Sequence, residues 1–142
     1  MDLQPLGHKI QSYNPSANLE RIRRAYDLAY RAHAGVMRST GDPYIAHCVE
    51  VAGILADLYL DEDAIVAALL HDVPEDTHVS LETIQKEFGD KVAELVVGVT
   101  NWRSRKMTAR GTSSQHHFHS KAEASFGWRV YARQRLALLL FY

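Results

Sequence analysis

Four ionisable side chains lie within six positions, directly after an apolar run. His71, Asp72, Glu75 and Asp76 follow residues 64–70, which are all Ala, Val, Ile or Leu. A helix that is apolar on every side is buried in its fold, so this run is expected to carry His71 and Asp72 into the interior. An imidazole and a carboxylate are costly to bury together unless something pairs with them. A divalent cation is the simplest partner. The alternative is an ordinary helix end, where His71 caps carbonyl groups and Asp72 is solvated.

His47 is the third residue of this candidate cluster. It lies 24 residues before His71 on an apolar stripe of a predicted helix, so its ring is expected to point inward. Taken alone, a histidine on such a stripe is more often a core residue than a ligand. Imidazole and carboxylate groups that converge from separate elements nevertheless suit a metal ion. Three protein ligands plus waters make an open site that activates water, and Glu75 and Asp76 could move protons there.

Residues 34–42 interrupt the helical pattern with two glycines and several hydroxyl or acidic side chains, which indicates a loop. Arg38 lies in this loop with Ser39 beside it. An arginine near hydroxyl groups can hold phosphate or stack on a planar base; the alternative is an ordinary surface loop. His33 precedes the loop at the end of a helical stripe. We interpret it as a core or capping histidine, with a functional role as the alternative.

Five helices and no convincing strand are predicted up to residue 100, so the predicted fold class is all-α. Asn18, Asp61 and Ser80 are suited to cap three of these helices. Pro43 suits the first position of another helix, and the last helix is expected to start at Asp90.

The end of the central helix is predicted from Pro74. Proline has no N–H and disfavours the helical state at the residue before it, here Val73. The helix should therefore stop near Asp72 and leave Glu75 and Asp76 in the following turn.

The distribution of charge divides the chain. Its 142 residues suffice for one domain. Residues 1–100 hold 8 Lys and Arg against 16 Asp and Glu, a balance of −8, whereas residues 101–142 hold 8 against 1, a balance of +7. We predict a loose lead-in over 1–18, a domain over 19–100 and an atypical basic tail over 101–142. The apolar end at residues 136–142 is expected either to fold back onto uncovered apolar surface of the bundle or to promote self-association.

Cysteine usage and hydropathy bear on the compartment. The single Cys48 excludes an internal disulfide and fits a reducing compartment. The N-terminus lacks a signal-peptide pattern, and no apolar run is long enough to span a membrane. We predict a cytoplasmic protein with neither a membrane nor a nucleic-acid partner.

Three motifs together resemble a known family. They are Ala32-His33-x-Gly35-x-x-Arg38-Ser39-x-Gly41-x-Pro43-Tyr44-Ile45-x-His47, then Ala67-Ala68-Leu69-Leu70-His71-Asp72-Val73-x-Glu75-Asp76-Thr77, then Phe88-Gly89 and Val92-x-x-Leu95-Val96-x-Gly98-Val99-Thr100. Their order and spacing over residues 19–100 resemble the N-terminal HD hydrolase domain of the RelA/SpoT family. The resemblance implies a helical HD bundle that binds Mn²⁺ (another divalent metal is the alternative). It also implies removal of the 3′-pyrophosphate from guanosine tetra- and pentaphosphate.

The same resemblance implies residue roles. His47, His71 and Asp72 correspond to metal ligands, and Glu75 and Asp76 to the pair that activates and positions the attacking water. Arg38 is expected at the guanine base, with Ser39 beside it.

The sequence departs from the family pattern after residue 90. The family has a further metal-binding Asp in a downstream Leu-Ala-Asp-Arg-x-His-Asn stretch, whereas this sequence has no Asp after Asp90. A truncation or frameshift near Asn101, or real divergence, would explain this. The bundle is accordingly expected to be incomplete at its C-terminal side. Two hypotheses follow. The first is an active hydrolase in which a tail group, such as Glu123 or one of the tail histidines, replaces the missing ligand. The second is a non-catalytic remnant, or a module that binds a nucleotide or a partner. Hydrolysis by this chain is expected to be impaired.

Overall fold

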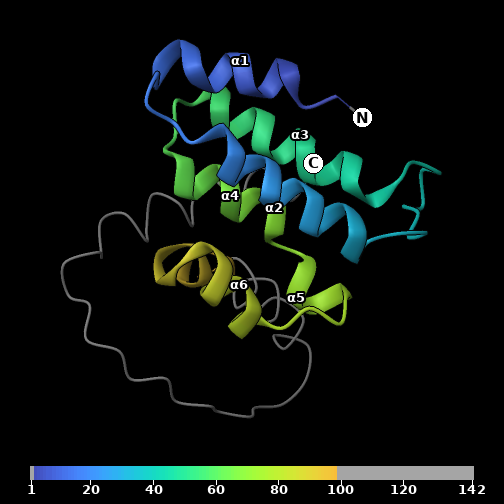
Figure 1. Cartoon of the computed structure of the whole chain (residues 1–142). Helices are drawn as coiled ribbons and strands as arrows, with labels where there is room; N and C mark the ends of the chain where they lie inside the picture. The colour runs from blue at the N-terminus through green and yellow to red at the C-terminus, as the bar shows by residue number, and fades with distance from the viewer. Residues whose placement is uncertain (1, 99–142) are drawn as a thin grey trace. The chain divides into compact units, whose positions relative to one another are not determined.

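The described part of the chain consists of helices joined by turns and loops. The computed structural model describes residues 2–98 (Figure 1). The helices are α1 (Gln4–Tyr13), α2 (Leu19–Ala32), α3 (Tyr44–Asp57), α4 (Glu62–Leu70), α5 (Val73–Asp76) and α6 (Leu81–Phe88), and residues 90–98 are also helical. Residues 2–98 contain no strand, only an isolated bridge between Met37 and Pro43. The predicted all-α class is therefore confirmed.

Several predictions fall outside the described residues. These are the basic tail over 101–142, the role of Glu123, the incomplete C-terminal side of the bundle, and self-association through residues 136–142.

α1 occupies a segment that we predicted to be a loose lead-in, so that prediction is wrong for residues 4–13. Leu6 and Ile10 are four residues apart and both are buried, and α1 packs on α3. Pro5 lies in the first turn, where its missing N–H removes no helical hydrogen bond. The Tyr13 hydroxyl donates to the Leu60 carbonyl at 2.8 Å. Two apolar residues in a polar, proline-containing segment were too weak a signal, and tertiary packing makes the helix.

α4 is the central helix of the described residues. Its residues 64–70 are all buried, as their apolar composition predicts, and it packs against both α2 and α3. The predicted cap is confirmed, because the Asp61 carboxylate accepts a hydrogen bond from the Ala64 amide at 3.0 Å. The caps at Asn18 and Ser80 are confirmed in the same way, by bonds from amides three residues later.

The chain breaks between α4 and α5. α4 ends at Leu70, and the one-turn helix α5 follows, so Glu75 and Asp76 lie in a helix rather than in the predicted turn. The reason is that Pro74 sits in the first turn of a new helix, where proline is tolerated. Asp72 occupies the N-cap position of α5, and its carbonyl accepts from the Asp76 amide at 3.0 Å. Similarly, Pro43 is the N-cap of α3 rather than its first residue.

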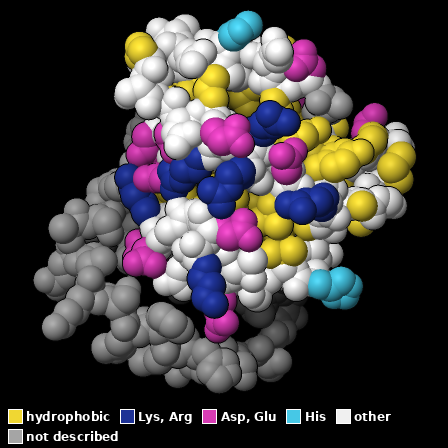
Figure 2. Space-filling model, in the orientation of Figure 1, with side chains coloured by type: hydrophobic (Ala, Val, Ile, Leu, Met, Phe, Trp, Pro, Cys, Tyr) yellow, Lys and Arg dark blue, Asp and Glu magenta, His cyan; other side chains and the backbone are white. Residues whose placement is uncertain are grey.

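A group of charged side chains, here called the Arg21 cluster, surrounds the start of α4; Arg21, Glu62 and Asp63 are half-buried and Lys91 is exposed. Arg21 Nη1 lies 2.8 Å from Glu62 Oε1 and 2.7 Å from Asp63 Oδ1. The same guanidinium donates to the carbonyl of Phe88, and Lys91 Nζ lies 3.3 Å from Asp63 Oδ2. The cluster therefore ties α2 to the N-terminal end of α4 and to the end of α6. Basic and acidic side chains are also interspersed on the face drawn in Figure 2.

Candidate metal centre

His47, His71 and Asp72 converge at the C-terminal end of α4. His47 comes from the first turn of α3, whereas His71 and Asp72 occupy the break between α4 and α5. One possible ligand atom from each residue lies within 4.8 Å of the others. Asp72 Oδ2 is 2.9 Å from His71 Nε2 and 3.9 Å from His47 Nε2. The structure thus brings together the three residues that the sequence predicted as metal ligands.

His71 has a ring nitrogen that lacks a hydrogen-bonding partner. The side chain is 1% exposed, and its Nδ1 lies 2.6 Å from the Ala68 carbonyl oxygen. A carbonyl only accepts, so Nδ1 carries a proton, and in the tautomer with a single proton Nε2 carries a lone pair. This buried Nε2 makes no hydrogen bond despite its short distance to Asp72. Two electron-rich atoms at that distance repel each other unless a cation lies between them. Two imidazoles and a buried carboxylate therefore fit a divalent cation.

Tyr44 belongs to this centre, although the sequence pattern assigned it no role of its own. Its hydroxyl donates to Asp72 Oδ2 at 2.7 Å. Burial raises the pKa of Tyr44 well above its ordinary value, and the hydrogen bond to Asp72 raises it further, so the hydroxyl stays protonated at neutral pH. The available signal was its position three residues before His47, which places both side chains on one side of α3.

The thiol of Cys48, the residue after His47 on α3, is buried and unreactive. Burial is the main cause that raises the pKa of Cys48 to about 12, with the negative charge of Asp72 as a further cause. Cys48 is therefore a neutral core residue rather than a nucleophile or a thiolate ligand.

α5 presents the two carboxylates that we predicted as the water-activating pair. Asp76 lies one helical turn after Asp72, and its charge contributes to the raised pKa of Tyr44, after burial and Asp72. Glu75 and Asp76 are both exposed. The short helix thus places a solvent-accessible acidic pair beside the buried ligands. Their catalytic role stays a prediction.

Arg38 and Ser39 lie in an ordered loop that leads directly into α3. The Arg38 amide donates to the Asp42 carbonyl at 2.8 Å, and the Arg38 carbonyl accepts from Gly41 at 2.9 Å, where φ is +89°. Arg38 is half-buried and Ser39 is exposed. The charge of Arg38 acts on Cys48 of α3, though less than burial and Asp72 do. The structure therefore places the loop beside the first turns of α3, and substrate binding by Arg38 and Ser39 stays a prediction.

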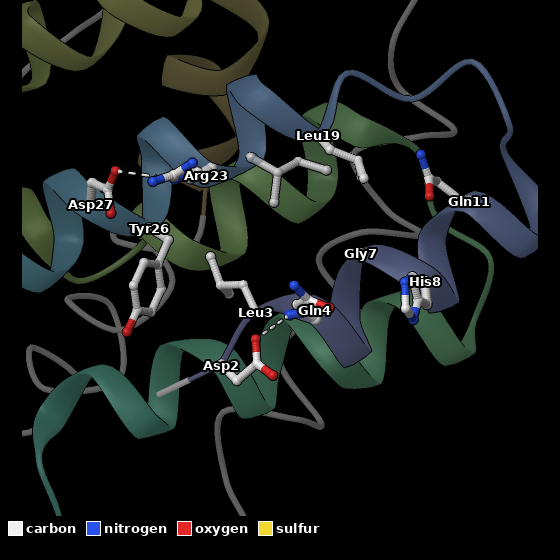
Figure 3. Close-up of a pocket in the computed structure, with 11 residues that line it drawn as sticks. Asp2, Leu3, Gln4, Gly7, His8, Gln11, Leu19, Arg23, Tyr26 and Asp27 are labelled. Atoms are coloured by element: carbon white, nitrogen blue, oxygen red, sulfur yellow. Dashed lines mark hydrogen bonds and ion pairs between the residues drawn. The ribbon is translucent and has the colours of Figure 1, made fainter.

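A surface hollow is formed by a different part of the chain from this centre. It measures about 570 Å³ and is lined by residues of α1, α2 and the segment before α1, among them Gln4, His8, Arg23 and Tyr26 (Figure 3). None of the predicted site residues lines it.

Among the described residues, none of the helices combines the length and the apolar character needed to cross a bilayer.

Comparison with known proteins identifies a family. A model described as "HD domain" matches residues 25–129 of this chain. The match covers the whole candidate centre. It also continues past residue 100, where we predicted the domain to end; the division at residue 100 stays a prediction.

Individual relatives agree with this match. The chain is 49% identical over 98 residues to a "Probable GTP pyrophosphokinase" of Mycobacterium leprae, which covers 69% of this chain and 12% of the relative. It is 43% identical over 115 residues to the "Bifunctional (p)ppGpp synthase/hydrolase SpoT" of Escherichia coli K12, covering 81% of this chain and 16% of the relative. The chain therefore spans less than a fifth of the length of these two curated relatives.

A solved structure is similar as well. It is described as a metazoan ortholog of SpoT that hydrolyzes ppGpp, and it matches with a TM-score of 0.53 and 36% identity. The similarity covers 56% of this chain and 47% of that chain. This chain therefore belongs to the HD domain family, and its relatives there are (p)ppGpp hydrolases and synthetases of the SpoT and RelA type.

Proposed function

We propose that this chain is a metal-dependent guanosine-3′,5′-bis(diphosphate) 3′-pyrophosphohydrolase of the stringent-response pathway. The observation that carries the proposal is the buried Nε2 of His71, which makes no hydrogen bond and converges with His47 and Asp72. Among the relatives are both synthases and hydrolases. A histidine and aspartate centre that can activate water favours hydrolysis over synthesis. We also propose that the protein is cytoplasmic. Its single cysteine, Cys48, cannot form an internal disulfide, which fits a reducing compartment.

His47, His71 and Asp72 would hold the metal, for which we propose Mn²⁺. When bound, a divalent cation would polarise a phosphoryl oxygen and lower the pKa of a water molecule. The surrounding residues suit this arrangement, because the Ala68 carbonyl holds the His71 ring with Nε2 directed away from that bond.

Glu75 and Asp76 would orient the attacking water and accept its proton. The water oxygen forms a bond to the phosphorus attached to the 3′-oxygen. The bond between that phosphorus and the 3′-oxygen breaks, and the 3′-oxygen takes up a proton. The products are pyrophosphate and a guanosine nucleotide with a free 3′-hydroxyl.

Arg38 and Ser39 would bind the guanosine part of the substrate. A half-buried guanidinium can stack on a purine and donate to its acceptors, and its loop leads straight into the helix that carries His47. Arg38→Ala should weaken the binding of guanosine tetraphosphate about 10-fold, the loss of one charge-assisted hydrogen bond. Arg31→Ala, at an exposed position of α2, is the matched control.

We further propose that turnover is slow. The described residues offer three converging ligands, and the chain has no Asp after Asp90 to supply the carboxylate that the family pattern has downstream. Turnover should therefore fall below the usual enzyme range, that is, below about 1 per second. The competing hypothesis is a non-catalytic module that binds the nucleotide or a partner.

Release of pyrophosphate from guanosine tetraphosphate at saturating Mn²⁺ tests the proposal. We expect slow release that needs the metal and is abolished in Asp72→Ala. Calorimetric binding of the nucleotide without any release would favour the binding module, and neither binding nor release would contradict both functions. Release that persists in Asp72→Ala would show that the reaction does not use this centre.

A further inference from the structure

Tyr44 forms a hydrogen bond with Asp72 Oδ2, the carboxylate oxygen closest to both histidines of the candidate metal centre. Its hydroxyl donates to Asp72 Oδ2 at 2.7 Å. The same Oδ2 lies 2.9 Å from His71 Nε2 and 3.9 Å from His47 Nε2. The tyrosine therefore holds the carboxylate oxygen that lies between both imidazoles.

The Tyr44 ring contacts two histidine rings, one stacked on it and one roughly perpendicular to it. His33 stacks on it with ring centroids 4.7 Å apart and an interplanar angle of 15°. His47 meets it edge-on at 5.9 Å and 78°. His33 is buried, and its Nδ1 bonds to the Ala29 carbonyl at 2.9 Å, which anchors the stack to the last turn of α2. The prediction of His33 as a core or capping residue is confirmed, since it is also the C-cap of α2.

This arrangement limits the freedom of the carboxylate. Asp72 lies in the break between α4 and α5, and its side chain is buried. A hydrogen bond from the packed Tyr44 phenol favours the side-chain rotamer in which Oδ2 lies close to the two histidines. Partners of this kind, behind a metal ligand, typically contribute 10–100-fold to metal affinity or activity.

We infer that Tyr44 is a positioning residue for the metal-binding carboxylate, and that His33 holds it in place by stacking. The inference rests on the proposed metal-dependent function. It adds a link from α2 through α3 to the centre: the end of α2 holds the Tyr44 ring, and the ring holds Asp72.

Tyr13 provides a matched control for the lost hydroxyl. Its hydroxyl also makes one partly buried hydrogen bond, to the Leu60 carbonyl at 2.8 Å, and none of the three candidate ligands takes part in it. Tyr44→Phe keeps the ring and its stack on His33, and Tyr13→Phe removes an equivalent bond elsewhere. A purely structural role would make the two variants behave alike toward metal.

The experiment is titration of the full chain and of both variants with Mn²⁺ alone, by calorimetry. The Mn²⁺-induced rise in melting temperature is the second readout. We expect Tyr44→Phe to bind Mn²⁺ about 10–100-fold more weakly and to show a smaller metal-induced rise. Tyr13→Phe is expected to bind Mn²⁺ like the unchanged chain.

Two results would overturn the inference while leaving the proposed function intact. One is an affinity of Tyr44→Phe within about two-fold of the unchanged chain, well short of the loss expected of a positioning partner. The other is an equal loss in Tyr13→Phe. If the unchanged chain binds no Mn²⁺, the proposed metal centre fails and the role of Tyr44 fails with it.

Discussion

The two ends of α4 both gather acidic residues, but they satisfy them in different ways. At the N-terminal end, Glu62 and Asp63 lie within 2.8 Å of the Arg21 guanidinium, and their side chains remain 20% and 23% exposed. At the C-terminal end, Asp72 is 1% exposed and meets two imidazoles and a phenol. In the Arg21 cluster, positive side chains of the protein balance the negative ones.

This difference separates a structural cluster from a candidate functional one. In the Arg21 cluster each acid has a permanent cation, so the contacts can stabilise the fold without any ligand. In the candidate metal centre the groups around Asp72 Oδ2 include the unpaired Nε2 of His71, which a bound cation would satisfy. Acidic residues gather at both ends of α4, so their density alone does not distinguish a candidate metal site. The types of group that contact each carboxylate do distinguish it.

The largest expected effect comes from one substitution made at both ends of α4. Asp72→Asn should weaken Mn²⁺ binding at least about 100-fold, because it removes a ligand and its charge. The stability of the metal-free protein should not fall, because the substitution removes a buried charge. Asp63→Asn should leave Mn²⁺ affinity unchanged and lower stability. Calorimetry and urea denaturation measure the two effects. Equal responses of the two variants to Mn²⁺ would remove the distinction between the ends.

The next effect concerns the Arg21 cluster alone. Arg21→Met should lower the free energy of unfolding by about 1.5–3 kcal/mol, because two partly buried carboxylates lose a charge-assisted partner. The matched control is Arg23→Met on the same helix. Arg23 lies 4.0 Å from Asp27 with its side chain 69% exposed, so its loss should change stability by less than about 0.5 kcal/mol. Similar urea midpoints for both variants would show that the cluster contributes nothing beyond a surface ion pair.

The smallest effect is a dependence of stability on pH. Burial alone would raise the pKa of Asp63, but hydrogen bonds from Arg21 and then Lys91 outweigh it and lower the pKa below the ordinary 3.8. A carboxyl whose pKa is lowered on folding stabilises the fold above its unfolded pKa, and this contribution is lost as pH falls through the folded value. The stability difference between the unchanged chain and Asp63→Asn should therefore shrink below about pH 4. Thermal melts at several pH values measure it, and a constant difference would contradict the prediction.

Local signals explain which parts of the fold could be predicted. The caps at Asn18, Asp61 and Ser80 were read correctly because a cap depends on a hydrogen bond to an amide only three residues away. The burial of residues 64–70 in α4 was predicted correctly because a helix without a polar face is stable only in the interior of a fold. The convergence of His47 with His71 and Asp72 was predicted from the motifs, and the described geometry agrees with it.

The sequence by itself thus determined the helices whose ends carry their own signals, and it predicted the three residues that converge as candidate metal ligands. Only the tertiary structure decided that residues 4–13 form α1, because Leu6 and Ile10 need the surface of α3 to bury them. It also decided that Tyr44 donates to Asp72 across 28 positions and that His33 stacks behind it. Such contacts join side chains from different helices, so they depend on how the helices pack rather than on the spacing of residues within any one of them.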